Sequence, residues 1–326
     1  LADEELARKT KLLDLVREIA LAANQATEYE DVVQFCLERV CAFTGWPVGH
    51  GYLIKDVKNS VIEYLPIWHL SDAEKYAPFV EASEQVHVRR GVHLPGEVLE
   101  KRNVVWREKI PRRDAGNESR GAAVRRAGLK SGFGAPVMVG NEVVAVIEFF
   151  SDEPTPRDEE IVDAMRQVGT EIGRVFERKR AEEQLRHSEQ QLRQIIDNAP
   201  LWIFVKNVEG RYLLANEAMG SVYNLTGEEL IGKRQEDIYP YREMTARIKE
   251  TDRDVIESGQ TKVFPEWRLF MPNGEERCMR LVKMPYKMQD GEVCVLGIGL
   301  DITDEKRVEE ERWRAQRLDA LGQMTG

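Results

Sequence analysis

Histidines and cysteines have the greatest potential for chemistry in this sequence, and their spacing argues against a catalytic or metal site. No two histidines are spaced as metal ligands on one helix face would be. The sequence also has no Gly-Lys-Ser/Thr phosphate loop, no His-Glu-x-x-His motif and no Cys-x-x-Cys pair. We therefore predict no catalytic residue and no metal site. The residues concerned are His50, His69, His87, His93, His187, Cys36, Cys41, Cys278 and Cys294.

The positions of the histidines determine which part of the chain could bind a histidine-ligated haem. His69, His87 or His93 could ligate a haem in the first half of the chain, but an ordinary polar role is the simpler interpretation. Residues 198–303 contain no histidine, which excludes a histidine-ligated haem there. The cofactor is therefore unknown, and none is predicted.

Four aromatic residues in the second half could surround a small organic ligand. Phe204, Tyr212, Tyr223 and Trp267 are of the types that line ligand pockets, which are mostly apolar with a few polar anchors. Ordinary core packing is the alternative for the same four residues. A ligand in the pocket of either half stays open.

Composition and charge limit the partners and the compartment. The 326 residues carry a net charge of −10, which disfavours nucleic acid and anionic membranes as partners. No apolar run is long enough to span a membrane, and the first residues lack the pattern of a signal peptide. A turn centred on Asp290-Gly291 would place Cys294 opposite Lys287, away from Cys278, so we predict no disulfide there. We expect a reduced, cytoplasmic protein.

The elements that would position these residues form two α+β halves. In the first, two amphipathic helices precede strands, and a hairpin turns at Gly140-Asn141. In the second, a hairpin and short helices precede three long strands. We expect an antiparallel sheet flanked by helices in each half. The long strands are apolar on both faces, so we expect helices on one face and a flanking helix or partner subunit on the other. The predicted faces are Leu281 with Leu296, Ile298 and Leu300, and Val282 with Met284 and Val295.

One helix is expected from Arg157 to Asp197, which is too long for a single compact domain. Its apolar residues follow steps of four and three, a stripe that buries best against a copy of itself, as in a coiled coil. We expect a connector that dimerises through parallel helices; a helix lying on its own domain is the alternative. The stripe is Ile161, Met165, Val168, Ile172 and Val175, then Ala181, Leu185, Leu192 and Ile195. A similar stripe near the start is Leu6, Leu13, Val16, Ala20 and Ala23.

Two stretches of the first half, Gly91–Val98 and Ala127–Val137, resemble a GAF domain, and the resemblance extends over residues 30–177. GAF domains are sensory modules that bind varied small molecules, or none. The segment Pro111–Arg126, with five arginines, is either a flexible flap over a pocket or a solvated loop with a short helix.

Residues 190–303 resemble a PAS domain, through motifs that include Ile196–Pro200, Lys206–Tyr212 and Asp301-Ile302-Thr303. The resemblance implies that Asp301 and Thr303 anchor the outgoing helix to the sheet and transmit a signal; capping alone is the alternative. Asn216 is placed to cap the helix that begins at Glu217.

The segment Arg317–Gly326 resembles the residues just before the phosphoacceptor histidine of a sensor histidine kinase. The resemblance implies ATP-dependent phosphorylation of that histidine in a homodimer, and transfer to a response regulator. The sequence contains neither that histidine nor an ATP-binding domain, so we expect a piece of a longer protein that is inactive alone. The alternatives are a GAF–PAS sensor for another output, such as a cyclic-dinucleotide cyclase, and a ligand-free dimerisation module.

These expectations give a sensory fragment built from five parts. Signal transmission is assigned to Asn216, Asp301 and Thr303 around the PAS-like sheet, and to Ile172, Val175, Leu185 and Leu192 along the connector. The parts are an N-terminal helix (1–27), a GAF-like domain (28–156), the connecting helix (157–197), a PAS-like domain (198–303) and an exit helix (304–326).

Overall fold

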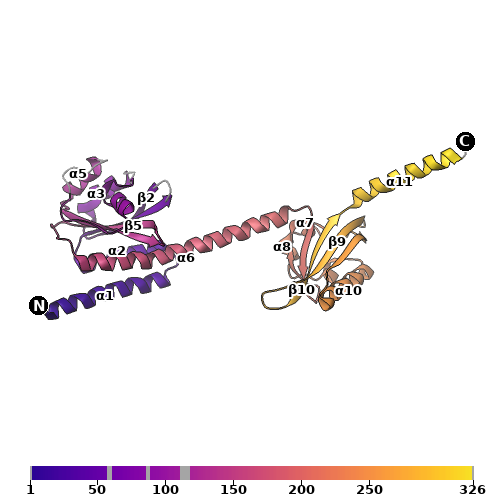
Figure 1. The fold of residues 1–326 in the computed structure, drawn as a ribbon, viewed down its shortest axis with the longest axis horizontal. Helices are drawn as coiled ribbons and strands as arrows, with labels where there is room; N and C mark the ends of the chain where they lie inside the picture. The colour runs from indigo at the N-terminus through magenta and orange to yellow at the C-terminus, as the bar shows by residue number, and fades with distance from the viewer. Residues whose placement is uncertain (1, 57–60, 86–88, 111–117, 325–326) are drawn as a thin grey trace. The chain divides into compact units, whose positions relative to one another are not determined.

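The computed structural model describes residues 2–56, 61–85, 89–110 and 118–324, which form two compact units (Figure 1). The units are residues 1–185 and 186–326. Their boundary falls inside the 40-residue helix α6 (Glu159–Asn198), so each unit includes part of this helix. Among the described residues, no helix combines the length and apolar character needed to cross a membrane.

The first unit contains an antiparallel five-stranded sheet in the order β2-β1-β5-β4-β3. Gly140, with a φ of 56°, forms the tight turn between β4 and β5, as the Gly140-Asn141 pair predicts. The strands are β1 (Val48–Asp56), β2 (Val61–Leu70), β3 (Val105–Arg107), β4 (Ser131–Val139) and β5 (Glu142–Ser151).

Helices cover both faces of this sheet and bury two apolar clusters. One face is covered by α2 (Tyr29–Thr44) and the first part of α6, and α1 (Ala2–Gln25) joins the same apolar cluster by packing on α2. The other face packs against α3 (Ala73–Glu84), α4 (His93–Lys101) and α5 (Glu118–Arg126). Figure 1 shows α3 and α5 on the opposite side of the sheet from α2 and α6.

The first part of α6 packs on its own domain, which corrects one prediction. Ile172 and Val175 are buried in the same core cluster as Ile161, Met165 and Val168. Helix and strand approach closely because two residues of α6 are glycines. A Cβ at Gly169 or Gly173 would overlap the carbonyl oxygen of Pro136 or Met138 in β4, respectively. This run is therefore an intramolecular contact, and assigning it to a seam between subunits was wrong.

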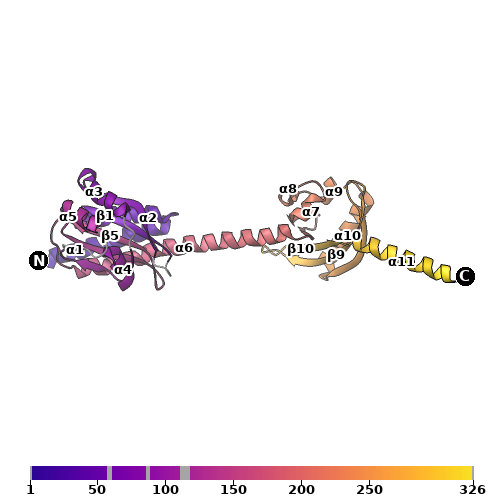
Figure 2. The ribbon, with the colours of Figure 1, turned by 90° about the horizontal axis from the view of Figure 1, so that it is seen from above.

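The second unit contains another antiparallel five-stranded sheet, in the order β7-β6-β10-β9-β8. Three short helices and the 17-residue α10 lie on one face of it, and Figure 2 shows α7, α8 and α9 together on that side. The last strand leads directly into α11 (Thr303–Met324). The strands are β6 (Trp202–Lys206), β7 (Tyr212–Ala215), β8 (Lys262–Phe270), β9 (Glu276–Lys287) and β10 (Val293–Asp301). The helices are α7 (Glu217–Ser221), α8 (Gly227–Leu230), α9 (Gln235–Ile238) and α10 (Arg242–Ser258).

The register between β9 and β10 differs by one residue from the prediction. Cys294 lies opposite Tyr286 rather than Lys287, because the loop has three residues between Met288 and Glu292, whose backbones bond to each other. Gly291 adopts a φ of 93° in this loop, as in a hairpin with an extra bulged residue. A one-residue slip exchanges the faces of a strand. Leu281 and Val295 therefore share the inner, helix-covered face, whereas the outer face has Val282, Met284, Leu296, Ile298 and Leu300, all partly exposed.

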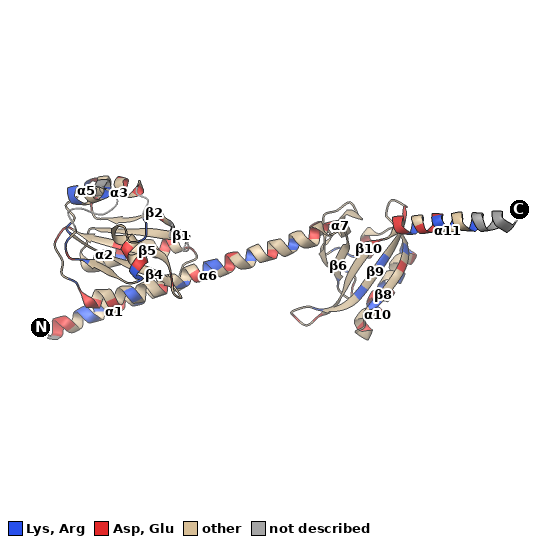
Figure 3. Cartoon of the chain, turned by 45° about the horizontal axis from the view of Figure 1, so that its top comes forward, with Lys and Arg blue, Asp and Glu red and all other residues tan. Residues whose placement is uncertain are grey.

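Apolar side chains remain exposed on three helices. In α6 these are Leu185, Leu192 and Ile195, each 58–67% exposed. In α1, Leu6 and Leu13 are exposed, whereas Leu12, Leu15, Ile19 and Ala23 are the residues that pack inward. Val308 and Trp313 are exposed on α11. Figure 3 shows charges of both signs along α6 and α11, which keep the rest of their surfaces polar.

Candidate functional site

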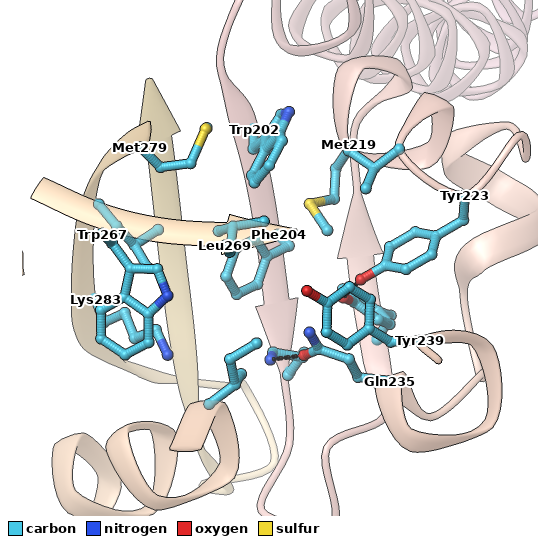
Figure 4. Close-up of a pocket in the computed structure, with 15 residues that line it drawn as sticks. Trp202, Phe204, Met219, Tyr223, Gln235, Tyr239, Trp267, Leu269, Met279 and Lys283 are labelled. Atoms are coloured by element: carbon cyan, nitrogen blue, oxygen red, sulfur yellow. Dashed lines mark hydrogen bonds between the residues drawn. The ribbon is translucent and has the colours of Figure 1, made fainter. Parts of the chain in front are cut away.

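The four aromatic residues singled out above surround one cavity in the second unit (Figure 4). Phe204 comes from β6, Tyr212 from β7 and Trp267 from β8, while Tyr223 follows α7. The Tyr212 and Tyr223 hydroxyl oxygens are 3.4 Å apart. Burial raises the pKa of both phenols, that of Tyr223 to about 12, so both are neutral near pH 7. The structure thus brings the predicted residues together, and their binding of a ligand stays a prediction.

The cavity is small, with a volume of about 50 Å³. A single water needs about 10–15 Å³ on this measure, so there is room for a group of a few non-hydrogen atoms. Pockets for drug-sized ligands are several times larger. Only a small molecule fits this cavity without movement of its walls.

Lys206 on β6 and Lys283 on β9 line the cavity, and both pair with Asp252 on α10 in a buried cluster of three charged side chains. Both lysines are 1% exposed and Asp252 is 5% exposed. The two carboxylate oxygens of Asp252 lie 2.6 Å from the Lys206 and Lys283 Nζ atoms, respectively. We call these three residues the buried charge cluster.

Each lysine of this cluster also donates a hydrogen bond to one neutral side chain. The Lys206 Nζ donates to the Gln235 Oε1 at 2.8 Å, and the Lys283 Nζ donates to the Thr251 Oγ1 at 2.7 Å. Burial lowers the pKa of Lys283 to about 8; Asp252 opposes this shift and Lys206 adds to it. Burial disfavours the Asp252 carboxylate, but the two ammonium groups outweigh it and hold the pKa of this acid below its usual range.

Neither lysine was predicted as a site residue, although strand periodicity could have found both. Side chains two residues apart in a strand share a face. Lys206 therefore follows Phe204 onto the inner face of β6, and Lys283 follows Leu281 on β9. A lysine within an apolar strand face is the signal, because buried lysines are rare unless paired.

Asn216 fastens the end of α6 to the core of this unit. Its side-chain oxygen accepts from the Ile203 and Met219 backbone N–H groups at 3.0 and 3.1 Å. Its amide nitrogen donates to the Ile196 and Leu201 carbonyl oxygens at 2.9 and 2.7 Å. Asn216 therefore caps α7, as its position predicts, and also joins α6 to the strand beside the cavity.

Asp301 and Thr303 fasten the start of α11 to the sheet. The Thr303 hydroxyl accepts from the Cys278 backbone N–H at 3.0 Å and donates to Asp301. Asp301 also accepts from the Thr303 backbone N–H at 2.9 Å and pairs with Arg277 at 2.9 Å. These contacts tie the helix to β9 as well as capping it. Their part in transmitting a signal stays a prediction.

The first unit contains a second buried ionic group, on the sheet face covered by α3, α4 and α5. The Arg120 guanidinium, 2% exposed, pairs with the buried Glu148 carboxylate at 2.5 Å. Burial opposes ionisation of Glu148, but Arg120 and His50 outweigh it and lower the pKa of this acid. Burial also lowers the pKa of His50, which keeps its ring neutral near pH 7. The Arg120–Glu148 pair is therefore balanced in charge.

The arginine-rich segment and the histidines lie in several places. Arg120 is part of α5 and buried, rather than in a solvated loop, while residues 111–117 lie outside the described residues. His93 is buried and His69 is partly exposed, and His87 lies outside the described residues. In the described ranges, no three His, Cys, Asp or Glu side chains could together hold a metal ion. The four cysteines are buried and free.

Curated relatives match parts of the chain. The methanogenesis regulatory histidine kinase FilI of Methanothrix harundinacea is 34% identical over 137 residues, which is 42% of this chain and 15% of the relative. The aerobic respiration control sensor protein ArcB of Escherichia coli is 29% identical over 127 residues, 39% of this chain and 16% of the relative. A diguanylate cyclase of Vibrio cholerae is 27% identical over 132 residues, 40% of this chain and 41% of the relative. The chain thus spans less than half of each.

Solved structures and family models match each unit. A GAF domain of a phosphoenolpyruvate-protein phosphotransferase from Coxiella burnetii is 15% identical, with a TM-score of 0.42, over 54% of this chain and 98% of that chain. A PAS domain of an HTR-like protein from Haloarcula marismortui is 19% identical, with a TM-score of 0.31, over 38% of this chain and 99% of that chain. Residues 26–177 match the GAF domain model and residues 196–307 match the PAS fold model. The chain therefore contains a GAF domain followed by a PAS domain.

Proposed function

We propose that this chain is the sensory region of a dimeric histidine kinase and controls that kinase through α6 and α11. Its tandem GAF and PAS domains and the two histidine kinases among its relatives support this. In such a kinase the γ-phosphoryl group of ATP moves to a histidine, releasing ADP, and then to an aspartate of a response regulator. The segment Arg317–Gly326, which resembles the approach to that histidine, favours this output.

One observation carries the proposed route of the signal. The PAS core holds both of its flanking helices by side-chain hydrogen bonds, α6 through Asn216 and α11 through Thr303. A change in the packing of that core would therefore alter the position of both helices. Helices that pair with a second copy can adopt two discrete arrangements, and a ligand shifts their balance only by binding one arrangement better.

Exposed leucines and an isoleucine on α6 support the dimer. Leu185 and Leu192 are seven residues apart, and Ile195 follows three residues later, which is the spacing of a coiled-coil seam. We propose that this half of α6 pairs with the same half in a second copy.

A second candidate output is cyclic-dinucleotide synthesis, which the diguanylate cyclase relative favours. The two outputs can be compared by fusing residues 1–326 to the catalytic region of a histidine kinase and, separately, to that of a diguanylate cyclase. Each fusion should be built with linkers that increase by single residues, so that the helix phase rotates by about 100° per step.

We expect autophosphorylation of the kinase fusion to rise and fall with the helical period of the linker. Thr303→Val, which removes the acceptor for Cys278, should change that activity in the favoured phase. If autophosphorylation of the kinase fusion changes neither with linker length nor with Thr303→Val, the proposal is contradicted. A periodic response of the cyclase fusion alone would favour the second candidate.

A further inference from the structure

The buried charge cluster has one more positive than negative charge. Within the described ranges, Asp252 is the one acidic group in ion-pair contact with Lys206 or Lys283. The cluster therefore has a net charge of +1 when both lysines are protonated, whereas the Arg120–Glu148 pair of the GAF domain is balanced. Burying an unpaired charge costs free energy, so an anion bound beside the two lysines would stabilise this arrangement.

Three hydrogen-bond donors at the same cavity have no acceptor among the described residues. Each ammonium has three N–H bonds, and each contacts two oxygens of the described residues, which leaves one N–H for a further acceptor. The indole nitrogen of Trp267 is buried and has no acceptor among the described residues. Figure 4 shows this nitrogen on the side of the ring that faces the middle of the cavity.

Apolar side chains beside the lysines define the rest of the ligand. Phe204, Met219, Met279 and Leu281 line the cavity beside the lysines. A carboxylate supplies one negative charge and two oxygens with about four lone-pair sites, which match the excess charge and the three donors. A dicarboxylate would reverse the imbalance rather than cancel it.

We propose that the PAS cavity binds a small monocarboxylate, with its carboxylate on Lys206, Lys283 and Trp267 and a short apolar chain against the methionines. The volume of about 50 Å³ limits this ligand to about two to four carbon atoms. The inference deepens the proposed function, because it names the chemical class of the signal for the PAS domain. Burial is the main cause of the lowered pKa of Lys283, and the second ammonium, Lys206, lowers it further.

Isothermal titration of the whole chain with butyrate tests the proposal, with butanamide as an uncharged molecule of the same shape and succinate as a dicarboxylate. We expect saturable butyrate binding in the millimolar range or tighter, and binding weaker by about tenfold or more for the other two. Equal affinity for butyrate and butanamide would overturn the assignment. So would the absence of saturation by all short monocarboxylates up to ~50 mM, a range that covers weak binding of so small a ligand.

Variants separate the site from general effects on folding. Lys283→Met leaves Lys206 and Asp252 as a balanced pair, so we expect a folded protein with about tenfold or more weaker butyrate binding. Lys287→Met changes an exposed lysine on the same strand and should bind butyrate like the unchanged chain. Circular dichroism checks the fold of each variant. Unchanged affinity in folded Lys283→Met would refute the site. The butyrate titration uses no output domain. A failure to bind butyrate can therefore be told apart from a failure of the kinase or cyclase fusions.

Discussion

Replacing Asp252 by Asn should destabilise the PAS domain far more than replacing Lys283 by Met, although each change alters one charge of the same cluster. Asp252→Asn leaves two ammonium groups, each 1% exposed, without a counter-ion. Removing one partner of a buried ion pair costs about 3–5 kcal/mol. Lys283→Met removes the unbalanced charge and leaves a neutral pair. The loss of the Lys283 hydrogen bonds is offset because the Lys283 ammonium no longer has to be removed from water. We therefore expect Lys283→Met to lower the free energy of unfolding by about 0–2 kcal/mol.

Hydrogen exchange of peptides from β9 and β10 at increasing urea measures this difference in the PAS domain alone. The exposed change Lys287→Met is the control and should lie within about 0.5 kcal/mol of the unchanged chain. If Lys283→Met costs as much free energy of unfolding as Asp252→Asn, the excess of positive charge is not present in the folded protein. The reasoning behind the anion site would then be refuted.

Three further predictions follow from the packing and the charges. Gly173→Ala, which places a methyl group against the Met138 carbonyl oxygen, should destabilise the GAF domain by about 3 kcal/mol in urea unfolding, although Ala favours helix; a gain in stability would contradict the close contact. Thr303→Val should cost about 1–2 kcal/mol and speed amide exchange at Cys278, and unchanged exchange would argue against the anchor. Butyrate affinity should be constant between about pH 6 and 8, where butyrate is ionised, and fall by up to about tenfold per pH unit above pH 8, because Lys283, whose pKa is about 8, then loses its proton; Lys283→Met should remove this fall in titrations across pH.

Much of the fold follows from local sequence signals. The Gly140-Asn141 turn and the cap at Asn216 could both be predicted, because turn and cap chemistry depends on neighbouring residues. The register of β9 and β10 could not, because the Asp290-Gly291 signal fits both a two-residue and a three-residue loop. The three-residue loop is the one that forms. Relative to β9, each residue of β10 therefore lies on the opposite face of the sheet from the one predicted.

The candidate site was predicted only in its apolar half. Aromatic residues such as Phe204 and Trp267 are expected at pockets, whereas lysines are usually assigned to the surface. The pairing of Lys206 and Lys283 through Asp252 joins three elements far apart in sequence, which no local pattern encodes. Similarly, the apolar stripe of α6 does not reveal its partner: steps of four and three suit both a core and a coiled coil.

Sedimentation equilibrium will decide whether the second half of α6 joins two copies of the chain. We predict a species of twice the 37.4 kDa chain mass, and a monomer for the double variant Leu185→Glu with Leu192→Glu. Val208→Glu, which changes an exposed valine between β6 and β7, should remain dimeric. A monomer at every concentration of the unchanged chain, or a dimer that survives both α6 substitutions, would contradict transmission through this helix.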